Sequence, residues 1–585
     1  MAQRQAEEVG RSLCLREPVS YFGDRDSDEE LDSLEEQEDS NTEEEADKFE
    51  FEERDESEQD SEEETTEPEG STSTTRKCRI VYGKDKYPWF LSLPETRDRS
   101  RQVHLPGAIN HAKVANSPLE CWSTLFSDNL LEVILKYTNI EIDKYHTEHD
   151  TANEPYQKHL GMAELKAFFG LLYFAGLKND NRINIAELWS YEFGSSIYRA
   201  TMNVRRFEFI ADRIRFDDKT TRAERKQTDG LAAVREIWDI FINNCQTNYT
   251  PSEFLTVDEQ LLGYRGRFSS KVYIKSKPDR YGIKIITLND AKTHYLYNAI
   301  PYAGRVNPPA NETIPSYYIR KICEPIYHSN RNITCDNWFS SVEIFNQMYK
   351  DYNLTMVGTI RKNKRQIPRS FKRTASVGTV RCGYDGTNVL MSWCPKKNKV
   401  VLILSSLHKS CKINKYSGKP ELVDFYNSTK AGTDVFNQCC ALHTCARKTN
   451  RWTMRFFLGM LDQASVNSYI LYNFDVLHKI ENRRTFLKEL SLSLITPHLH
   501  NRKNTSGLHI TVIKDINNIL SETDIPNVDK NDKLQIRKRC SVCEYNRNKK
   551  TLYCCSKCKK PLCEDHRVRY CYDCAMYYKS CDIKT

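Results

Sequence analysis

The feature that most constrains how this chain can fold is a run of paired metal ligands near its C-terminus. Four close pairs contribute eight ligands: Cys540 and Cys543, Cys555 and Cys558, Cys563 and His566, and Cys571 and Cys574. Eight ligands suffice for two closed tetrahedral zinc sites, and so short a segment has too little apolar core to fold without metal. We therefore predict a cysteine-rich domain over residues 536–580 that holds two structural Zn²⁺ ions.

These ligands can be divided between the two ions in more than one way. We expect interleaved, cross-brace pairing, which gives one ion Cys540, Cys543, Cys563 and His566 and the other Cys555, Cys558, Cys571 and Cys574. Sequential pairing along the chain stays open, and Cys554 and Cys581 are spare. Cross-brace modules include ubiquitin-ligase RINGs and histone-reading fingers, but a histidine in sixth position fits neither common ligand order.

Charge is distributed unevenly along the chain. Residues 24–70 contain 26 acidic and 3 basic residues, whereas residues 71–585 carry a net charge of +29. The acidic segment has too few apolar residues to offset its ordering entropy, so we predict a disordered arm over 1–75, followed by a basic linker over 76–104. The basic excess favours nucleic acid as partner. Serines among the carboxylates are plausible substrates of an acidophilic kinase.

Other features indicate a soluble intracellular protein. The longest apolar run, residues 167–177, falls short of the roughly 18 residues of a membrane-spanning helix, so we expect no membrane association. The N-terminus lacks the apolar core of a secretory signal. Nine of the 21 cysteines follow residue 539 in paired spacings, which indicates metal binding in a reducing compartment rather than disulfides.

The hydrophobic period changes near residue 250. Before that point, apolar residues recur at helical spacing in 162–177, 204–214 and 231–242, which predicts a helical domain. After it, segments such as 254–258 and 281–288 are rich in β-branched and aromatic residues and are predicted to be strands. The chain is therefore expected to be a multidomain α+β protein.

Three aspartates stand at element ends where a metal site could form. Asp258 and Asp336 each end an apolar strand, and Asp434 opens a later helix. If Thr433 caps that helix, Asp434 lies in its first turn and shares a face with Asn437, three residues on. An aspartate near a helix start is also a common cap, so this pattern alone leaves both interpretations open. Enzymes that cut and rejoin phosphodiesters hold two divalent cations with carboxylates from different elements.

At four motifs the chain resembles the piggyBac transposases and their domesticated derivatives. The motifs are residues 255–267, 332–339, 358–368 and 447–452. The resemblance runs from about residue 105 to the C-terminus. It implies an RNase H-like catalytic domain over 254–361 and 421–443, interrupted by a β-rich insertion over 362–420. It also implies a split helical domain for dimerisation and DNA binding over 105–253 and 444–500, and we expect a linker over 501–535.

The resemblance also implies roles for individual residues. Asp258, Asp336 and Asp434 would be the catalytic ligands of two Mg²⁺ ions. Active members carry a fourth aspartate where this chain has Asn437, whose amide can bind magnesium but lacks the charge and cannot accept a proton as a carboxylate can. The residues expected at DNA are Arg361, Lys364, Arg365, Arg447, Lys448, Arg451 and Trp452. Trp452 could stack on an unpaired base, although core packing would also account for a lone tryptophan.

Three hypotheses follow from the sequence. The first is a nuclear, homodimeric, magnesium-dependent transposase that binds terminal inverted repeats in double-stranded DNA. By resemblance it would nick the repeat ends, form hairpins and integrate at TTAA. The second is a domesticated descendant that binds DNA or chromatin and whose catalysis is impaired by Asn437. The third is a zinc-module protein that acts mainly through protein partners.

Overall fold

The computed structural model describes residues 79–92, 103–149, 154–275, 277–304, 308–310, 312–474, 482–523, 533–554 and 560–566. The predicted acidic arm, residues 1–75, lies outside this range. The chain divides into two compact units, residues 1–506 and 507–585. No helix in the described part of the chain combines the length and apolarity needed to cross a membrane.

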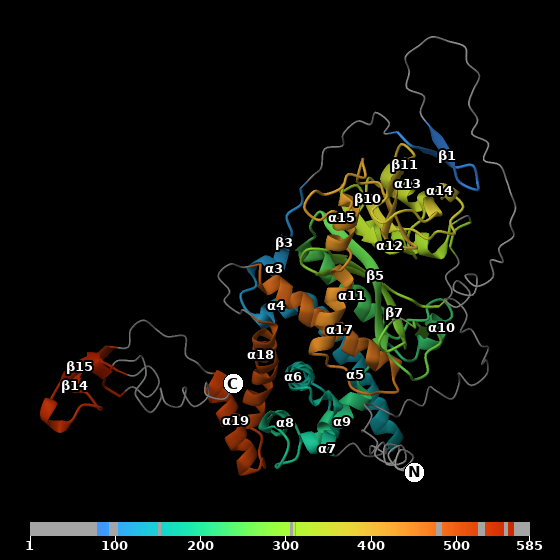
Figure 1. Ribbon diagram of the computed structural model, residues 1–585. Helices are drawn as coiled ribbons and strands as arrows, with labels where there is room; N and C mark the ends of the chain where they lie inside the picture. The colour runs from blue at the N-terminus through green and yellow to red at the C-terminus, as the bar shows by residue number, and fades with distance from the viewer. Residues whose placement is uncertain are drawn as a thin grey trace, which may run out of the picture. The chain divides into compact units, whose positions relative to one another are not determined.

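The first unit is built on a mixed sheet that has 11 strands within the described residues. Figure 1 shows β5 and β7 of this sheet in green and β10 in yellow-green. In pairing order the strands are β1 (Ile80–Tyr82), β2 (Pro88–Phe90), β11 (Val380–Tyr384), β12 (Val389–Lys396), β13 (Lys399–Ser405), β10 (Thr355–Thr359), β9 (Asn332–Cys335), β5 (Phe254–Gly263), β7 (Tyr281–Asp290) and β6 (Val272–Tyr273), with β8 (Leu296–Pro301) paired to β7 off this path.

The centre of the sheet is parallel and its flanks are antiparallel. β9 runs parallel to both β5 and β10, whereas β7 pairs with β5 in the antiparallel direction over its whole length. β7 is buried on both faces from Gly282 to Asp290, which explains why its sequence is apolar almost without alternation. The strand predictions at 254–258 and 281–288 are thereby confirmed, and both strands extend further than predicted.

Helices surround the sheet and form a body of their own. Those before the sheet are α3 (Asn110–Val114), α4 (Pro118–Leu125), α5 (Asp128–His149), α6 (Met162–Lys178), α7 (Ile185–Leu188), α8 (Ser196–Thr201), α9 (Val204–Arg213), α10 (Arg222–Lys226) and α11 (Arg235–Thr247). Those within and after it are α12 (Ile314–Cys323), α13 (Val342–Lys350), α14 (Arg369–Lys372), α15 (Glu421–Thr429), α16 (Gly432–Leu442), α17 (Trp452–Tyr472) and α18 (Arg483–Lys503). The short strands β3 (Gly107–Ala108) and β4 (Tyr249–Thr250) pair with each other.

Helices from both ends of the first unit pack into one helical body. α6 contacts α18, and α4 contacts both α17 and α18, although more than 200 residues of sheet and loops separate these helices in sequence. α17 is buried on nearly all sides, which is why its apolar residues do not form a single stripe. Phe457 of α17 packs against Phe126, Phe169 and Phe216, so one aromatic cluster joins the early and late helices.

Two segments predicted to be linkers contain regular structure. Within 76–104, β1 and β2 form a hairpin on the sheet edge, and Trp89 is fully buried. Strands of three residues are too short to show a period, so the prediction was wrong there. Within 501–535, residues 510–523 form helix α19 (Ile510–Thr523) in the second unit. Its apolar residues Ile513, Ile516 and Leu520 do recur at helical spacing, and this signal was missed.

The segment predicted as a β-rich insertion, 362–420, does not form a sheet of its own. Its strands β11, β12 and β13 continue the main sheet, because β13 pairs with β10. Cys382 on β11 is disulfide-bonded to Cys411, with Cα atoms 6.3 Å apart. This pairing differs from the expectation that the cysteines would remain reduced, and it arises because the chain after β13 returns beside β11.

The second unit contains α19 and a two-stranded antiparallel sheet. β14 (Lys533–Arg539) pairs with β15 (Lys550–Tyr553), and an isolated bridge joins Cys554 to Pro561. Cys555, Cys558, Cys571, Cys574 and Cys581 lie outside the described residues.

The close approach of α16 to β5 depends on a glycine. A Cβ at Gly432 would lie 2.5 Å from Thr256 Oγ1, which donates a hydrogen bond to the Thr429 carbonyl. We expect Gly432→Ala to destabilise the first unit by about 1–2 kcal/mol, since overpacking outweighs the gain in helix propensity. Urea unfolding would measure this. Gly107→Ala, where a Cβ meets nothing within 4 Å, should leave the midpoint unchanged, and equal midpoints for both variants would contradict the packing argument.

Candidate active site

Asp258 and Asp336 lie side by side because their strands are parallel neighbours. Val257 on β5 is in register with Cys335 on β9, so the aspartates that follow both residues project from the same level of the sheet. Each carboxylate is fixed locally by a backbone amide. Glu259 N donates to Asp258 Oδ1 at 2.8 Å, and Trp338 N donates to Asp336 Oδ1 at 3.0 Å. Parallel pairing therefore brings together two side chains 78 positions apart in sequence.

Helix α16 carries the third aspartate across β5 and β7. Thr433, expected to cap this helix, is instead buried, and its hydroxyl donates to Asn289 Oδ1 on β7 at 3.0 Å. The N-cap position is Ala431, whose side chain makes no capping bond, so that part of the prediction was wrong. Asp434 nevertheless lies in the first turn, where its side chain is exposed.

Asn437 faces the strand that bears Asp258. Its Nδ2 donates to the backbone carbonyl of Glu259 at 3.5 Å. Its Oδ1 is buried and has no hydrogen-bond partner among the described residues. A buried amide oxygen without a donor is destabilising unless something else binds it, so this atom is available as a ligand.

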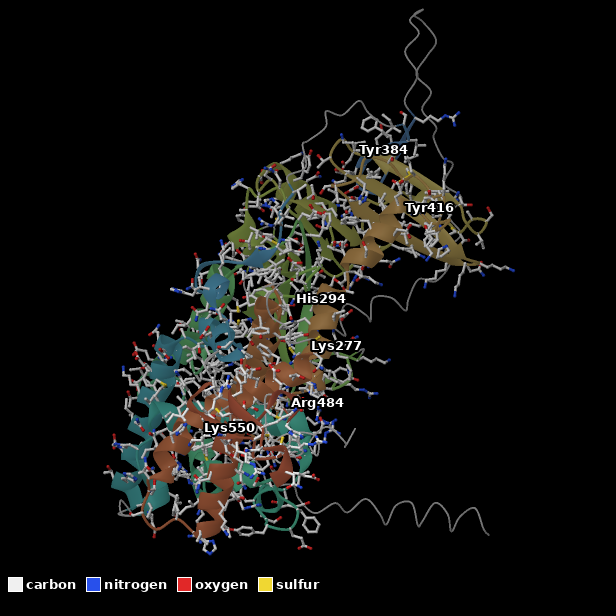
Figure 2. All side chains as sticks on the ribbon, turned by 90° about the vertical axis from the view of Figure 1, so that its left-hand side faces the viewer. Lys277, His294, Tyr384, Tyr416, Arg484 and Lys550 are labelled. Carbon is white, nitrogen blue, oxygen red and sulfur yellow. A yellow bond between two sulfur atoms is a disulfide. The ribbon has the colours of Figure 1, made fainter. Side chains whose placement is uncertain are left out.

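A lysine that the sequence did not single out lies among these acids. Lys277 Nζ is 3.6 Å from Glu259 Oε1 and donates to the Glu259 carbonyl at 3.2 Å. Although burial opposes it, the negative charges of Glu259, Asp258 and Asp434 raise the pKa of Lys277. Figure 2 labels this side chain beside the sheet. Nothing in the sequence distinguishes Lys277 from other loop lysines, whereas Glu259 could have been noticed because it directly follows Asp258.

The electrostatics of the site suit divalent cations. Burial, followed by the neighbouring Glu259 carboxylate, raises the pKa of Asp258, and burial likewise raises that of Asp336. A bound cation would favour the ionised carboxylates, and their oxygens, with Asn437 Oδ1, are ligands of the kind that Mg²⁺ prefers.

The basic loop, residues 361–366, begins beside this site. Arg361 Nε donates to Asn337 Oδ1 at 3.2 Å, which places its guanidinium next to the Asp336 turn. Lys364 is half-buried, and this burial lowers its pKa, whereas Arg365 is exposed. These three residues remain predicted DNA contacts.

Two arginines predicted to contact DNA are buried instead. Arg451 is 4% exposed, and its guanidinium donates to the backbone carbonyls of Ala211, Asp212 and Ile214. Arg447 is equally buried and donates to the carbonyls of Asp180 and Ile183. Both guanidinium groups satisfy backbone carbonyls at the ends of helices and turns inside the helical body, so the structure favours an internal structural role for both.

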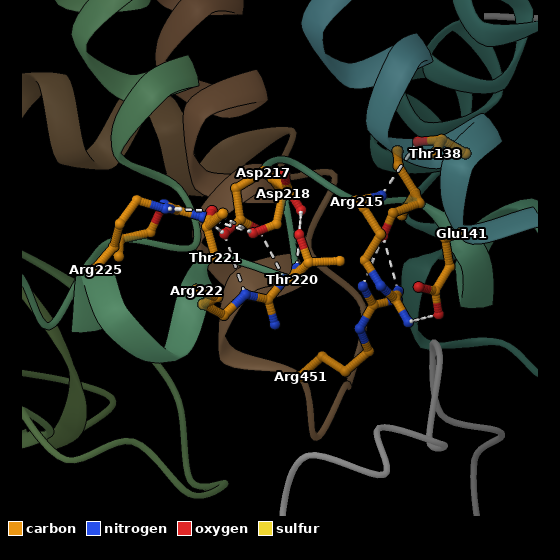
Figure 3. Close-up of polar contacts among 12 residues, drawn as sticks. Thr138, Glu141, Arg215, Asp217, Asp218, Thr220, Thr221, Arg222, Arg225 and Arg451 are labelled. Atoms are coloured by element: carbon orange, nitrogen blue, oxygen red, sulfur yellow. Dashed lines mark hydrogen bonds and ion pairs between the residues drawn. The ribbon is translucent and has the colours of Figure 1, made fainter. Parts of the chain in front are cut away.

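Lys448 and Trp452 differ from these two arginines in their surroundings. Lys448 is exposed, and Trp452 is half-buried with its ring 4.7 Å from that of Phe268. Both Trp452 and Phe268 line a cavity of about 430 Å³ between α5, α10 and the start of α17. Arg451 also lines this cavity, and Figure 3 shows it beside the Arg215–Glu141 ion pair. Trp452 therefore packs against Phe268 and also faces the cavity, so both interpretations of this tryptophan remain compatible with the structure.

The C-terminal unit brings four predicted zinc ligands together. The ligand atoms of Cys540, Cys543, Cys563 and His566 all lie within 4.8 Å of one another, and His566 Nδ1 is 3.3–3.7 Å from the three sulfurs. Hydrogen bonds from backbone amides, opposed by burial, lower the pKa of Cys540 to about 6, which favours the thiolate. The group can hold one metal ion, and it is the first of the two interleaved sets.

Comparison with known proteins identifies the family of this chain. The family model described as Transposase IS4 matches residues 117–469, more than half of the chain. A solved piggyBac transposase, determined as a synaptic complex with hairpin DNA, is 35% identical and has a TM-score of 0.69. The match covers 80% of this chain and 99% of that one. The chain belongs to the piggyBac transposase family.

More distant relatives are human proteins derived from the same family. PiggyBac transposable element-derived protein 3 of Homo sapiens and the chimeric ERCC6-PGBD3 protein of Homo sapiens are each 22% identical over 385 residues, 61% of this chain. The matched regions span 62% and 34% of those two proteins. The piggyBac resemblance of the four sequence motifs is thereby confirmed at the level of the family.

The buried arginine can be tested against its exposed neighbour. We expect Arg451→Lys to destabilise the first unit by at least about 2 kcal/mol, because one ammonium cannot satisfy three separated carbonyls and each orphan costs about 1–3 kcal/mol. Lys448→Ala, at an exposed position, should change the free energy of unfolding by less than about 0.5 kcal/mol. Urea unfolding of both variants measures the difference. An Arg451→Lys protein as stable as the wild type would contradict the structural role assigned to Arg451.

The proposed metal site formed by the Cys and His group can be tested by measuring the metal content of variants. Cys540→Ser should lower the bound metal by about one ion per chain, since a closed tetrahedral site loses one of its four ligands. Cys554→Ser removes a nearby thiol outside the group and should leave the content unchanged. Elemental analysis of the purified proteins measures both, and equal loss in the two variants would speak against this ligand set.

Proposed function

We propose that this chain is a DNA transposase that uses divalent metal ions to cut and rejoin phosphodiester bonds. The observation that carries the proposal is the parallel β5–β9 register, which aligns Asp258 with Asp336 below the helix that bears Asp434. Separate carboxylates converging from two strands and a helix are what a two-ion phosphodiester site requires. By family likeness, the substrates would be terminal inverted repeats and a TTAA target in double-stranded DNA.

The three aspartates would hold two Mg²⁺ ions, and Asn437 Oδ1 would supply a further oxygen. When bound, such ions sharpen the attacking oxygen and stabilise the leaving one. Glu259 stays paired with Lys277, whose positive charge limits repulsion among the carboxylates before DNA arrives. The backbone amides of Glu259 and Trp338 fix the orientation of two of the three carboxylates.

The cationic residues near the site would bind the DNA backbone. Arg361, Lys364 and Arg365 would contact phosphates, and Lys448 and Trp452 would contribute from the helical body. We further propose two structural Zn²⁺ ions in the C-terminal unit, which would help to read the repeats. A homodimer, a nuclear location and phosphorylation of the acidic arm by an acidophilic kinase complete the proposal. The related solved transposase forms a synaptic complex with hairpin DNA, which supports DNA as the partner.

A second candidate function is favoured by Asn437. If the fourth ligand must be a carboxylate, this chain is a domesticated DNA- or chromatin-binding protein whose cleavage is impaired. An amide carries no charge and accepts no proton, so the site would bind metal more weakly and would lack a base at that position.

A cleavage assay separates the two candidates. Purified full-length protein is incubated with Mg²⁺ and a duplex that carries the repeats flanking its coding sequence, and nicked and hairpin products are resolved on a denaturing gel. We expect the wild type to produce both. Asp258→Ala should reduce the rate at least about a hundredfold, because several kcal/mol of transition-state stabilisation is lost. Asp351→Ala, at an exposed residue of α13's C-terminal end, is the matched control.

The other outcomes are equally informative. A silent wild type with an active Asn437→Asp variant would identify a disabled enzyme and establish the second candidate. Cleavage that survives Asp258→Ala would refute the assignment of the site itself.

A further inference from the structure

The β1–β2 hairpin lies at the edge of the main sheet but pairs with the neighbouring strand β11 at a single position. Its own strands pair at three positions, from Ile80–Phe90 to Tyr82–Pro88, but only Phe90 and Tyr384 link it to β11. Figure 1 shows β1 at the end of the sheet beside β11 and α14. Most of its remaining polar contacts are made to the basic loop and to α13.

Two hydrogen bonds from the hairpin fix the far end of the basic loop. Lys84 N donates to the Arg365 carbonyl at 2.7 Å, and Trp89 Nε1 donates to the Gln366 carbonyl at 2.8 Å. Next to Lys84, the backbone of Gly83 approaches the loop so closely that a Cβ there would lie 2.6 Å from both carbonyl oxygens. The hairpin therefore contacts the main chain of the loop, and these hydrogen bonds do not involve the cationic side chains of the loop.

The hairpin is itself held rigidly. Tyr87 Oη donates to Asp385 Oδ2 at 2.7 Å and accepts from Asn346 Nδ2 of α13 at 3.2 Å. Burial, reinforced by Asp385, raises the pKa of Tyr87, so the hydroxyl remains a neutral donor. Trp89 is fully buried against β11, where a Cβ at Gly383 would lie 3.2 Å from the Trp89 Cβ.

The near end of the basic loop is fixed at the candidate active site. Arg361 bonds Asn337, next to Asp336, and Lys364 N donates to the Arg361 carbonyl at 3.3 Å within the loop. Gln366 Nε2 donates to Glu343 Oε1 of α13 at 2.6 Å. A loop with four cations in five residues would otherwise spread through mutual repulsion, and these contacts oppose that.

We propose that the β1–β2 hairpin is a positioning element for the basic loop, with Gly83 and Trp89 as its positioning residues. By fixing the Arg365 and Gln366 carbonyls, the hairpin orders the loop before DNA binds, so that Arg361, Lys364 and Arg365 meet phosphates without a further ordering cost. This inference rests on the proposed function in that DNA is the ligand of the loop.

A simpler interpretation is that the hairpin only covers the exposed edge of β11. Edge cover explains the single bridge to Tyr384 and the burial of Trp89. It does not require donors aimed at the carbonyls of a loop that follows a different strand, nor a glycine where the two main chains meet. The two interpretations differ in what loss of the Trp89 donor should do.

The test uses the full-length chain and the variant Trp89→Phe, which keeps a buried ring and removes the donor to Gln366. Trypsin cuts after lysine and arginine, so the initial cleavage rate after Lys362, Lys364 and Arg365 reports the order of the loop directly. We expect roughly a three- to tenfold increase, the shift in local opening produced by one lost hydrogen bond. Trp393→Phe on β12 of the same sheet, where the indole donates to no described residue, is the matched control and should match the wild type.

DNA binding is measured on the same proteins by fluorescence anisotropy with a duplex oligonucleotide at several salt concentrations. Trp89→Phe should weaken binding by roughly three- to tenfold and make the slope of log Kd against log salt shallower by up to about one unit. Gly83→Ala, which forces the two main chains apart, should act in the same direction. Circular dichroism and urea unfolding establish that each variant is folded.

Wild-type values for both Trp89→Phe and Gly83→Ala would overturn the proposal and leave edge cover. Faster proteolysis with unchanged DNA binding would also overturn it, since the loop would then be ordered for another purpose. Weakened binding together with an inactive wild type in the cleavage assay would uphold the positioning role while rejecting the catalytic function. If the wild type binds no DNA, the proposed function and this inference both fail.

Discussion

The arrangement of the candidate site depends on one interaction, the parallel pairing of β5 with β9. Because Val257 is in register with Cys335, the two following aspartates must lie at the same level on adjacent strands. A slip of one residue would turn one of them to the opposite face of the sheet. The antiparallel pairing of β5 with β7 then provides the surface on which α16 rests, with Gly432 against Thr256 and Thr433 bonded to Asn289. The position of Asp434 follows from that packing.

Buried arginines hold the helical body around this sheet. Arg451 binds carbonyls at the C-terminal end of α9, and Arg206 joins Glu164 of α6 to the carbonyls of Tyr156, Lys158 and His159. Such guanidinium groups satisfy several orphan carbonyls at once, which one lysine could not do. A basic composition is therefore only partly a sign of nucleic-acid binding here. Some of the cations in the described part of the chain are internal, whereas Arg365 of the basic loop and Lys448 are exposed.

Much of the secondary structure could be predicted where an element is long enough to show a period. α6 and β7 were identified because 17 and 10 consecutive residues carry a consistent pattern. The β1–β2 hairpin could not be identified, because its strands have three residues each and its stability comes from Trp89 and Tyr87 contacts with remote segments. The continuation of the main sheet through β13 and β10 is likewise a long-range pairing that no local pattern encodes.

The sequence alone predicted the family and a Cys and His ligand group whose members the structure brings together, because motif identity and ligand spacing are local properties of the chain. Cys540, Cys543, Cys563 and His566 needed only their spacing to be named. Tertiary structure decided which charged residues are buried and which are exposed. Arg451 and Lys448 look alike in a short basic motif, yet Arg451 is buried among backbone carbonyls and Lys448 is exposed. The same holds for Lys277 and the hairpin contacts, since their roles arise from neighbours that only the folded chain brings near. Whether a charged residue stabilises the interior or binds a ligand depends on its burial, and a sequence pattern does not contain that burial.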